Sequence, residues 1–405
     1  MQQALSDIKI LDFSHLLQGP FATQLLGDLG ADIIKIERAG TGDMFRSITF
    51  FNEWVGDSES PSFLAWNRNK RSLAVNLKSP RIHEILMDMA KSADVVVQNF
   101  RPGVMEKLGY GYEDFRLVNP KLIYCSGSGY GESGPYVTRP GQDMLIQGLT
   151  GVAAATGRAD QPPVPLGAGL PDQLGAMNMV YGILAALLWR EKSGKGQKIE
   201  VNLMAGMMAH LNQEFVSVLN LNRDFERPNS GIGHPGAEAP FGIYGTRDGR
   251  FVSIAMSPFG HLARTLNADH LLVYDSPDQL FAKRDEIWEA VNEVTKTFDC
   301  EKLLDILLRA DVWTAEVKDF RSAAQDPQIE HLGLIQSYEH PLAGEVKVVG
   351  SAIQMSETPS KIKRPAPMIG EHGAEILKEY GISADEIAKL IETGDVTIQH
   401  APERE

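Results

Sequence analysis

The sequence predicts an α/β fold with a large domain built on a parallel sheet, followed by a smaller α+β domain. Within the first 125 residues, five short β-rich runs alternate with intervals that are mostly long enough for a crossover helix. After residue 222 the pattern changes to a hairpin followed by helical segments. The chain has 405 residues and 43% hydrophobic content, more than one core usually organises, which also favours two domains.

The expected elements follow in chain order. In the first half we expect strands at residues 8–13, 32–36, 72–77, 94–98, 121–125 and 199–203, with helices at 21–29, 79–93 and 176–189. Residues 222–236 are polar and rich in turn formers, which is typical of a linker. Beyond it we expect a hairpin at 241–244 and 251–255, helices at 276–298, 301–309, 374–380 and 384–393, and an extended segment at 336–349.

The composition indicates which macromolecular partners the protein can bind and in which cellular compartment it is expected. The net charge of −14 argues against non-specific binding to nucleic acid or to an anionic membrane. The longest apolar helical run, 177–188, is shorter than the ~20 residues that span a bilayer. Cys125 and Cys300 form no CxxC pair, and the first residues do not resemble a signal peptide. We therefore expect a cytoplasmic protein that binds neither nucleic acid nor membrane.

Basic side chains gather near the predicted strand ends. They are Lys35, Arg38, Arg68, Lys70, Arg71, Lys78, Arg101 and Lys107. In an acidic chain, such a group near the edge where α/β sheets bind ligands predicts an anionic ligand with phosphates. No GxGxxG or GxxxxGK[ST] motif follows the first strand, so the usual nicotinamide and P-loop signatures are missing.

One carboxylate has two interpretations. Asp172 lies in the turn 167–175 (GAGLPDQLG), directly before the small-residue helix. It is either the N-cap of that helix or a nucleophile, and the local pattern alone favours the cap. Metal catalysis is not expected, because HExxH, GxSxG and CxxC are absent and the ten histidines are scattered. His15 and His234 are the histidines most suited to reach a cleft, although a structural role is favoured for each.

The accumulated motifs resemble the class III CoA-transferases, the CaiB/BaiF family that includes formyl-CoA transferase. The matching segments occur in order at residues 10–14 (ILDFS), 19–20 (GP), 29–38 (LGADIIKIER), 69–72 (NKRS), 99–103 (NFRPG), 119–123 (NPKLI), 129–131 (GYG), 134–135 (GP), 139–143 (RPGQD), 194–197 (GKGQ) and 370–372 (GEH). Any one of these motifs is weak, but several in fixed order along most of the chain are specific.

The resemblance implies a mechanism. Asp172 occupies the position of the family's nucleophilic aspartate, which forms an aspartyl anhydride and then an aspartyl-CoA thioester. Gly231, Gly233 and His234 match the family's glycine-containing loop and are expected to support the substrate or its oxyanions. Asp143 is expected to position the substrate or to tune the charge of Asp172. Coenzyme A and acyl-CoA are substrates, and no tightly bound cofactor or metal is needed.

The resemblance also implies the CoA contacts. The matching positions are Leu17, Gln18, Arg38, Val75, Asn76, Leu77, Lys78, Asn99, Phe100, Arg101, Lys107 and Arg139. Formyl-CoA transferase has a glutamine at the position of Leu17, whereas here the glutamine is the next residue, so the resemblance does not by itself imply formyl or oxalyl specificity.

The implied fold is a large Rossmann-like domain and a small α+β domain joined by long linkers, with two chains interlocked as a homodimer. We assign residues 1–222 to the large CoA-binding domain, 223–334 to the small domain, and 335–405 to a segment that returns to the large domain.

Three functions compete. The first is transfer of CoA from an acyl-CoA donor to a carboxylic acid acceptor, with succinyl-CoA and a small dicarboxylate as the favoured pair. The second is α-methylacyl-CoA racemase activity, an isomerisation. Racemases of this superfamily carry a His-Asp pair where this chain has Gln142 and Asp143, so one proton-transfer group is missing. The third is a non-catalytic CoA-binding homologue, which would be expected to lack Asp172 or its glycine turn.

Overall fold

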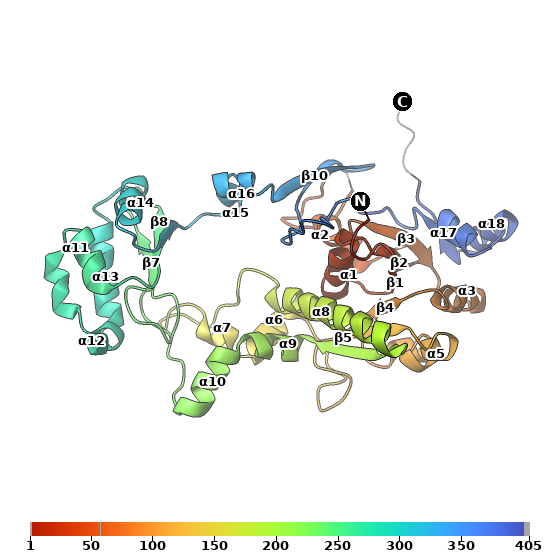
Figure 1. The fold of residues 1–405 in the computed structure, drawn as a ribbon, viewed down its shortest axis with the longest axis horizontal. Helices are drawn as coiled ribbons and strands as arrows, with labels where there is room; N and C mark the ends of the chain where they lie inside the picture. The colour runs from red at the N-terminus through yellow and green to blue at the C-terminus, as the bar shows by residue number, and fades with distance from the viewer. Residues whose placement is uncertain (1, 57, 401–405) are drawn as a thin grey trace. The chain divides into compact units, whose positions relative to one another are not determined.

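The chain forms two compact units, each of which is described separately. The computed structural model describes residues 2–56 and 58–400. The first unit comprises the described parts of residues 1–146, 169–210 and 327–405, and the second comprises 147–168 and 211–326 (Figure 1). The sequence-based division at residues 222 and 335 stays a prediction.

A seven-stranded sheet forms the centre of the first unit. Its strand order is β12-β3-β2-β1-β4-β5-β6, and every neighbouring pair is parallel except β12 with β3. The strands are β1 (Lys9–Asp12), β2 (Asp32–Arg38), β3 (Lys70–Val75), β4 (Val95–Gln98), β5 (Ile123–Ser128), β6 (Lys198–Asn202) and β12 (Val396–Thr397). The predicted α/β class with a parallel sheet is confirmed.

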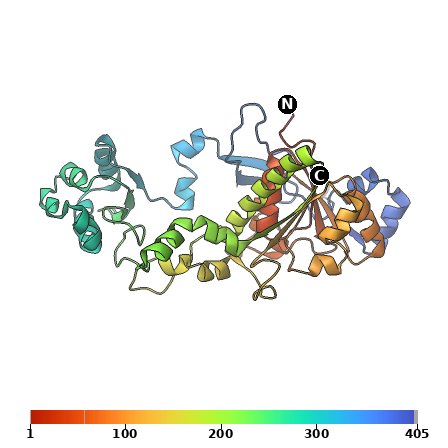
Figure 2. The same cartoon turned by 60° about the horizontal axis from the view of Figure 1, so that its bottom comes forward.

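Helices cover both faces of this sheet. One core contains α1 and α8 against Ile10, Ile33 and Val95, and Figure 2 shows the two helices together on that face. The other core contains α3, α5, α17 and α18 against Leu11, Ile34 and Val96. Each of these residues directly follows one of the first three in its strand, and successive side chains of a strand point to opposite faces of the sheet. The helices of this unit are α1 (Gln18–Asp28), η1 (Met44–Ser47), α2 (Pro61–Trp66), α3 (Pro80–Ala90), α4 (Val104–Lys107), α5 (Tyr112–Val118), α8 (Leu170–Ser193), α9 (Leu203–His210), α16 (Pro327–His331), α17 (Gly373–Glu379) and α18 (Ala384–Glu392), and α6 (Asp143–Leu149) begins here.

The extended segment expected at residues 336–349 is a hairpin rather than one strand. It consists of β10 (Ile335–His340) and β11 (Gly344–Val349), which pair antiparallel. Val346 of this hairpin packs against Phe63 and Leu64 of α2. The late segment is therefore joined to the first unit by a small apolar core.

The second unit is a small α+β structure. Its three-stranded antiparallel sheet has the order β7-β8-β9, built from β7 (Gly242–Gly245), β8 (Phe251–Ile254) and β9 (Thr314–Glu316). The helices are α7 (Val152–Ala155), α10 (Asn212–Leu221), α11 (Phe259–Thr265), η2 (Asp269–Tyr274), α12 (Pro277–Ala282), α13 (Arg284–Thr295), α14 (Cys300–Arg309) and α15 (Phe320–Ala323). The helical pattern expected at residues 276–298 forms two helices, α12 and α13, which are separated at Lys283. Among the described residues, no helix combines the length and apolarity needed to cross a membrane.

Buried charges connect the first three strands. Lys70 Nζ lies 3.1 Å from Asp12 Oδ2, and Lys35 Nζ lies 2.8 Å from Asp43 Oδ2. Burial alone would raise the pKa of Asp12, but the charges of Lys70 and Lys35, with hydrogen bonds from Ser14 and Thr23, lower it to about 2. Asp12 is therefore ionised at neutral pH and depends on its cations.

We expect Lys70→Met to destabilise the protein by roughly 3–5 kcal/mol, because it leaves the Asp12 carboxylate buried without its main partner. The midpoint of urea unfolding measures this. The exposed pair of Lys91 with Asp88 is the control, and Lys91→Met is expected to change stability by less than about 1 kcal/mol. Equal effects of the two substitutions would contradict the role of the buried pair.

Candidate active site

The direction of the strand order reverses between β1 and β4, and the candidate site lies where these two strands end. Parallel α/β sheets bind ligands at such a point, outside the carboxyl ends of the strands. Two reciprocal hydrogen bonds hold the loops together: His15 N donates to Asn99 Oδ1 over 2.9 Å, and Asn99 Nδ2 donates to His15 O over 2.8 Å. The His15 ring meets Phe100 edge-on, with ring centres 4.8 Å apart.

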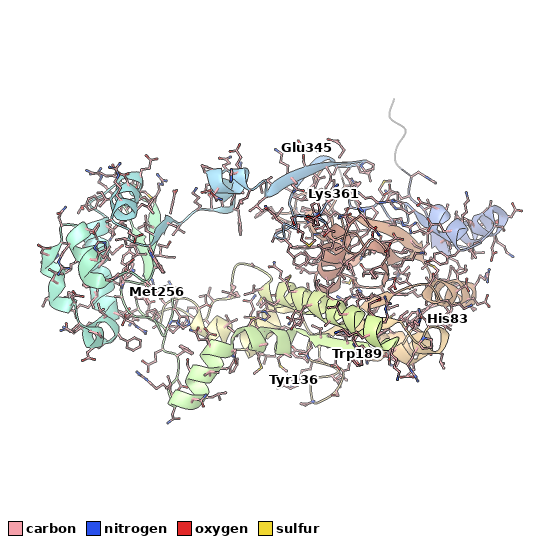
Figure 3. The ribbon with its side chains drawn as sticks, viewed as in Figure 1. His83, Tyr136, Trp189, Met256, Glu345 and Lys361 are labelled. Carbon is pink, nitrogen blue, oxygen red and sulfur yellow. The ribbon has the colours of Figure 1, made fainter. Side chains whose placement is uncertain are left out.

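A cavity of about 300 Å³ opens at these loops and contains Asp172. The first loop contributes His15, Leu17 and Gln18 to its lining. The segment after β4 contributes Asn99, Phe100 and Arg101. The last residue of β5, Ser128, also lines the cavity, and the segment after it contributes Tyr130, Tyr136 and Arg139. Figure 3 labels Tyr136 in that last segment. The Arg139 guanidinium stacks on the Tyr136 ring at 3.7 Å.

Asp172 is not the N-cap of its helix. α8 begins at Leu170 with Gly169 as the N-cap, so Asp172 is the third helical residue. Its backbone N–H instead donates to Asp143 Oδ2 over 3.2 Å. Asp143 thus satisfies one free N–H of the first turn, and the N-cap Gly169 has no side-chain hydrogen bond among the described residues, so the Asp172 carboxylate does not cap the helix.

The surroundings of Asp172 make its carboxyl a weak acid. Burial raises its pKa, the negative charge of Asp143 raises it further, and the result is a pKa of about 7. A carboxylate with this pKa is only partly ionised at neutral pH, and its ionised form is poorly solvated. Both properties are typical of a catalytic group rather than a structural one.

A second, larger cavity of about 800 Å³ adjoins the first. It shares Met44, His15, Phe100 and Arg101 with the cavity that holds Asp172. Arg38 and Lys78 line it as well, and both are exposed. An elongated ligand with an anionic end at these cations could therefore extend toward Asp172.

The predicted CoA-contact residues fall into two groups with one exception. Leu17, Gln18, Asn99 and Arg139 line the smaller cavity, Arg38, Val75, Asn76, Leu77 and Lys78 line the larger one, and Phe100 and Arg101 line both. Lys107, at the end of α4, lines neither of these two cavities. The side chain of Asn76 already donates to Asp395 Oδ1 over 3.0 Å.

The predicted glycine loop belongs to the second unit. Gly233 and His234 line an apolar cavity of about 460 Å³ there, and His234 Nε2 lies 3.4 Å from Glu214 Oε1. Gly231 packs so closely that a Cβ would come within 2.6 Å of Ile243 O. A role for this loop beside Asp172 stays a prediction.

The predicted phosphate-binding group of cations is partly wrong. Four of its members are held by acidic partners within the protein: Lys35 by Asp43, Arg68 by Asp28, Lys70 by Asp12, and Arg71 by Asp32, Glu375 and Glu379. β3 also begins at Lys70 instead of Ser72, because Lys70 and Arg71 pair with Ile33 and Ile34 of β2.

Sequence reasoning missed residues at the end of β5 and in the segment after it. Ser128, Tyr130 and Tyr136 were not among the candidates, although they line the cavity of Asp172. The predicted fifth strand ended at Cys125, whereas β5 continues to Ser128. The rule that ligands bind after the carboxyl ends of parallel strands could have found them.

Comparison with known proteins decides the family. The model of CoA-transferase family III matches residues 5–373. The chain belongs to this family. It is therefore an enzyme of the CoA-transferase class, as the resemblance predicted.

Named relatives span nearly the whole chain. Human succinyl-CoA:glutarate CoA-transferase is 34% identical over 98% of this chain and 90% of its own length. Succinyl-CoA:mesaconate CoA-transferase of Haloarcula hispanica is 36% identical over 94% of this chain and 97% of its own length. Among solved structures, a CaiB/BaiF family protein from Brucella suis aligns with a TM-score of 0.82 at 30% identity, covering 94% of this chain and 100% of the other.

We expect Asp172→Asn to raise the melting temperature at pH 8. Because the folded pKa of about 7 lies above the ordinary value of 3.8, the folded state holds the proton more tightly, and stability falls as pH rises between these values. Asparagine cannot ionise, so it removes this loss of stability while keeping the shape of the aspartate side chain.

Differential scanning calorimetry at pH 5 and pH 8 measures the effect. The gain over the wild type should be larger at pH 8. The matched control Asp88→Asn, on the exposed face of α3, should show no such pH dependence. A gain that is the same at both pH values would contradict the raised pKa.

Proposed function

We propose that this enzyme transfers CoA from an acyl-CoA donor to a carboxylic acid through covalent intermediates on Asp172. The observation that carries the proposal is the partly buried Asp172 carboxylate, with its pKa raised to about 7, in a cavity that adjoins a larger one lined by exposed cations. A nucleophilic carboxylate and a binding site for an anionic cosubstrate are the two requirements of the reaction.

The proposed reaction consists of four acyl-transfer steps, and each leaving group is accounted for. The Asp172 carboxylate attacks the donor thioester carbonyl, and the CoA thiolate leaves to give an acyl aspartyl anhydride. The thiolate then attacks the aspartyl carbonyl, which releases the donor acid and gives the aspartyl-CoA thioester. The acceptor carboxylate attacks this thioester to form a second anhydride and release the thiolate. Attack of the thiolate on the acceptor acyl carbonyl yields the new acyl-CoA and regenerates Asp172.

The charge of the site supports the binding of CoA in the larger cavity. CoA is a polyanion and the chain carries a net charge of −14, so binding needs a local basic site. Arg38, Lys78 and Arg101 are exposed side chains on that cavity. We assign them to the phosphates and assign the shared residues His15 and Phe100 to the passage of the thioester toward Asp172.

The relatives support a substrate class. Two of the similar enzymes are named for succinyl-CoA as donor, with glutarate or mesaconate as acceptor. We propose succinyl-CoA and a small dicarboxylic acid for this chain. Asp143 is proposed to tune Asp172, and Gly231, Gly233 and His234 are proposed to support the substrate.

Mass spectrometry of the protein incubated with a panel of acyl-CoA donors and trapped with hydroxylamine or borohydride tests the chemistry. We expect a donor-dependent modification on the peptide that contains Asp172, and none in Asp172→Asn. If no modification forms and deuterium instead enters the α-carbon of a 2-methylacyl-CoA, the protein is a racemase rather than a transferase.

The pH profile tests the role of Asp143. We expect kcat/KM to rise with pH through a midpoint near the Asp172 pKa of about 7, because attack requires the ionised carboxylate. Asp143→Asn removes one of the two influences that raise this pKa, so the midpoint should move to lower pH. The control Asp88→Asn should leave the midpoint in place, and an unmoved midpoint in Asp143→Asn would refute the coupling.

A further inference from the structure

The side-chain amide nitrogen of Gln18 is buried at the cavity that Asp172 lines and has no acceptor among the described residues. Gln18 is the first residue of α1 and is 4% exposed. Its Nε2 has no hydrogen-bond acceptor among the residues that the structure describes. Buried amide groups are almost always paired, and an unpaired one costs about 1–3 kcal/mol. We therefore ask whether the Gln18 amide binds a substrate group.

Two glycines make the space for this amide. A Cβ on Gly127, in β5, would lie 2.6 Å from Gln18 Oε1. A Cβ on Gly175, in α8, would lie 2.7 Å from Gln18 Nε2. Both distances are far below van der Waals contact, so a side chain at either position would displace the amide. The side chain of Gln18 is thus lodged between β5 and α8.

The amide lies next to the turn of α8 that carries Asp172. Residues three apart in a helix share one face, and Gly175 follows Asp172 by three positions. Gln18 and Asp172 also line the same cavity of about 300 Å³. Gln18 is not among the residues that line the larger, cationic cavity. This placement favours a contact with the acyl part of the substrate over the CoA contact that the resemblance implied.

We propose that Gln18 donates a hydrogen bond from its amide to a carbonyl or carboxylate oxygen of the acid that is exchanged at Asp172. Both are hydrogen-bond acceptors, and either would supply the partner that the amide nitrogen lacks among the described residues. Where this oxygen lies outside the reacting carboxyl group, Gln18 is also a determinant of which acid is accepted, because an acid without an oxygen at this point leaves a buried donor unpaired. The inference rests on the proposed transfer at Asp172.

Gln18→Met tests the proposal, because methionine fills a similar volume without a donor. We expect kcat/KM for the acceptor acid to fall by roughly 10- to 100-fold, the range for a lost hydrogen bond to a charged partner. The melting temperature should stay the same or rise, since an unpaired buried group is removed. Inhibition by free CoA should not change, because the larger cavity is untouched.

Gln24→Met is the matched control. Gln24 lies in the same helix, is 2% exposed, and has an unpartnered Oε1, yet it does not line the cavity of Asp172. We expect its substitution to leave kcat/KM unchanged. Gln18→Glu provides a second test that keeps the side-chain shape: its negative charge should move the pH midpoint of kcat/KM upward by raising the pKa of Asp172.

Three outcomes would overturn the inference: wild-type kcat/KM in Gln18→Met, equal losses in the Gln18 and Gln24 variants, or weaker inhibition by CoA that accounts for the whole effect. Failure of the proposed function is distinguishable from these outcomes. In that case the wild type itself forms no adduct at Asp172 with any acyl-CoA donor of the panel.

Discussion

The buried ion pair of Lys35 with Asp43 is the interaction on which the site depends. Lys35 comes from a central strand, and its Nζ also donates to Ser14 O over 2.9 Å. Asp43 Oδ1 accepts from Leu16 N, a residue held at a φ of 65°. The pair thus fixes both ends of the short loop that leads into α1. Because a residue other than glycine rarely adopts a positive φ, this loop conformation needs such support, and the position of Gln18 follows from it.

Asp143 shows how one carboxylate can both support and destabilise a neighbour. Its oxygen accepts the backbone N–H of Asp172 and so stabilises the first turn of α8, while its charge raises the pKa of the Asp172 carboxyl. The same face of α8 borders the unpaired amide of Gln18. A buried carboxylate and an unpaired donor in one cavity both reduce folding stability. They persist where binding or chemistry uses them, which fits a site adapted to a charged, oxygen-rich substrate.

The sequence predicted the regular parts of the fold well, because parallel strands buried on both faces appear as short apolar runs. β4 was placed to within one residue for this reason. Two features were not predicted correctly from the sequence, and both depend on contacts between segments that are distant in the chain. The role of Asp172 was ambiguous because the carboxylate that accepts its backbone N–H, that of Asp143, lies 29 residues earlier in the chain. Lys70 was assigned to a loop because its partner Asp12 lies on another strand. Local patterns contain no information about such partners.

Whether a basic residue forms an internal ion pair or lines the cavity, by contrast, follows from the direction of its strand. This distinction could have been derived from the sequence. Arg68 precedes β3 and Arg71 is its second residue, so both lie at the amino end of the strand, on the edge of the sheet opposite the candidate site, and both are bound by acidic partners. Arg38, Lys78 and Arg101 lie at or beyond the carboxyl ends of β2, β3 and β4, and all three line the larger cavity. The same residue types therefore have different surroundings at the two edges of the sheet: acidic partners at the amino end of β3 and a cavity beyond the carboxyl ends. In a parallel sheet, a cation is a candidate for ligand binding when it follows its strand, and a candidate for an internal ion pair when it precedes it.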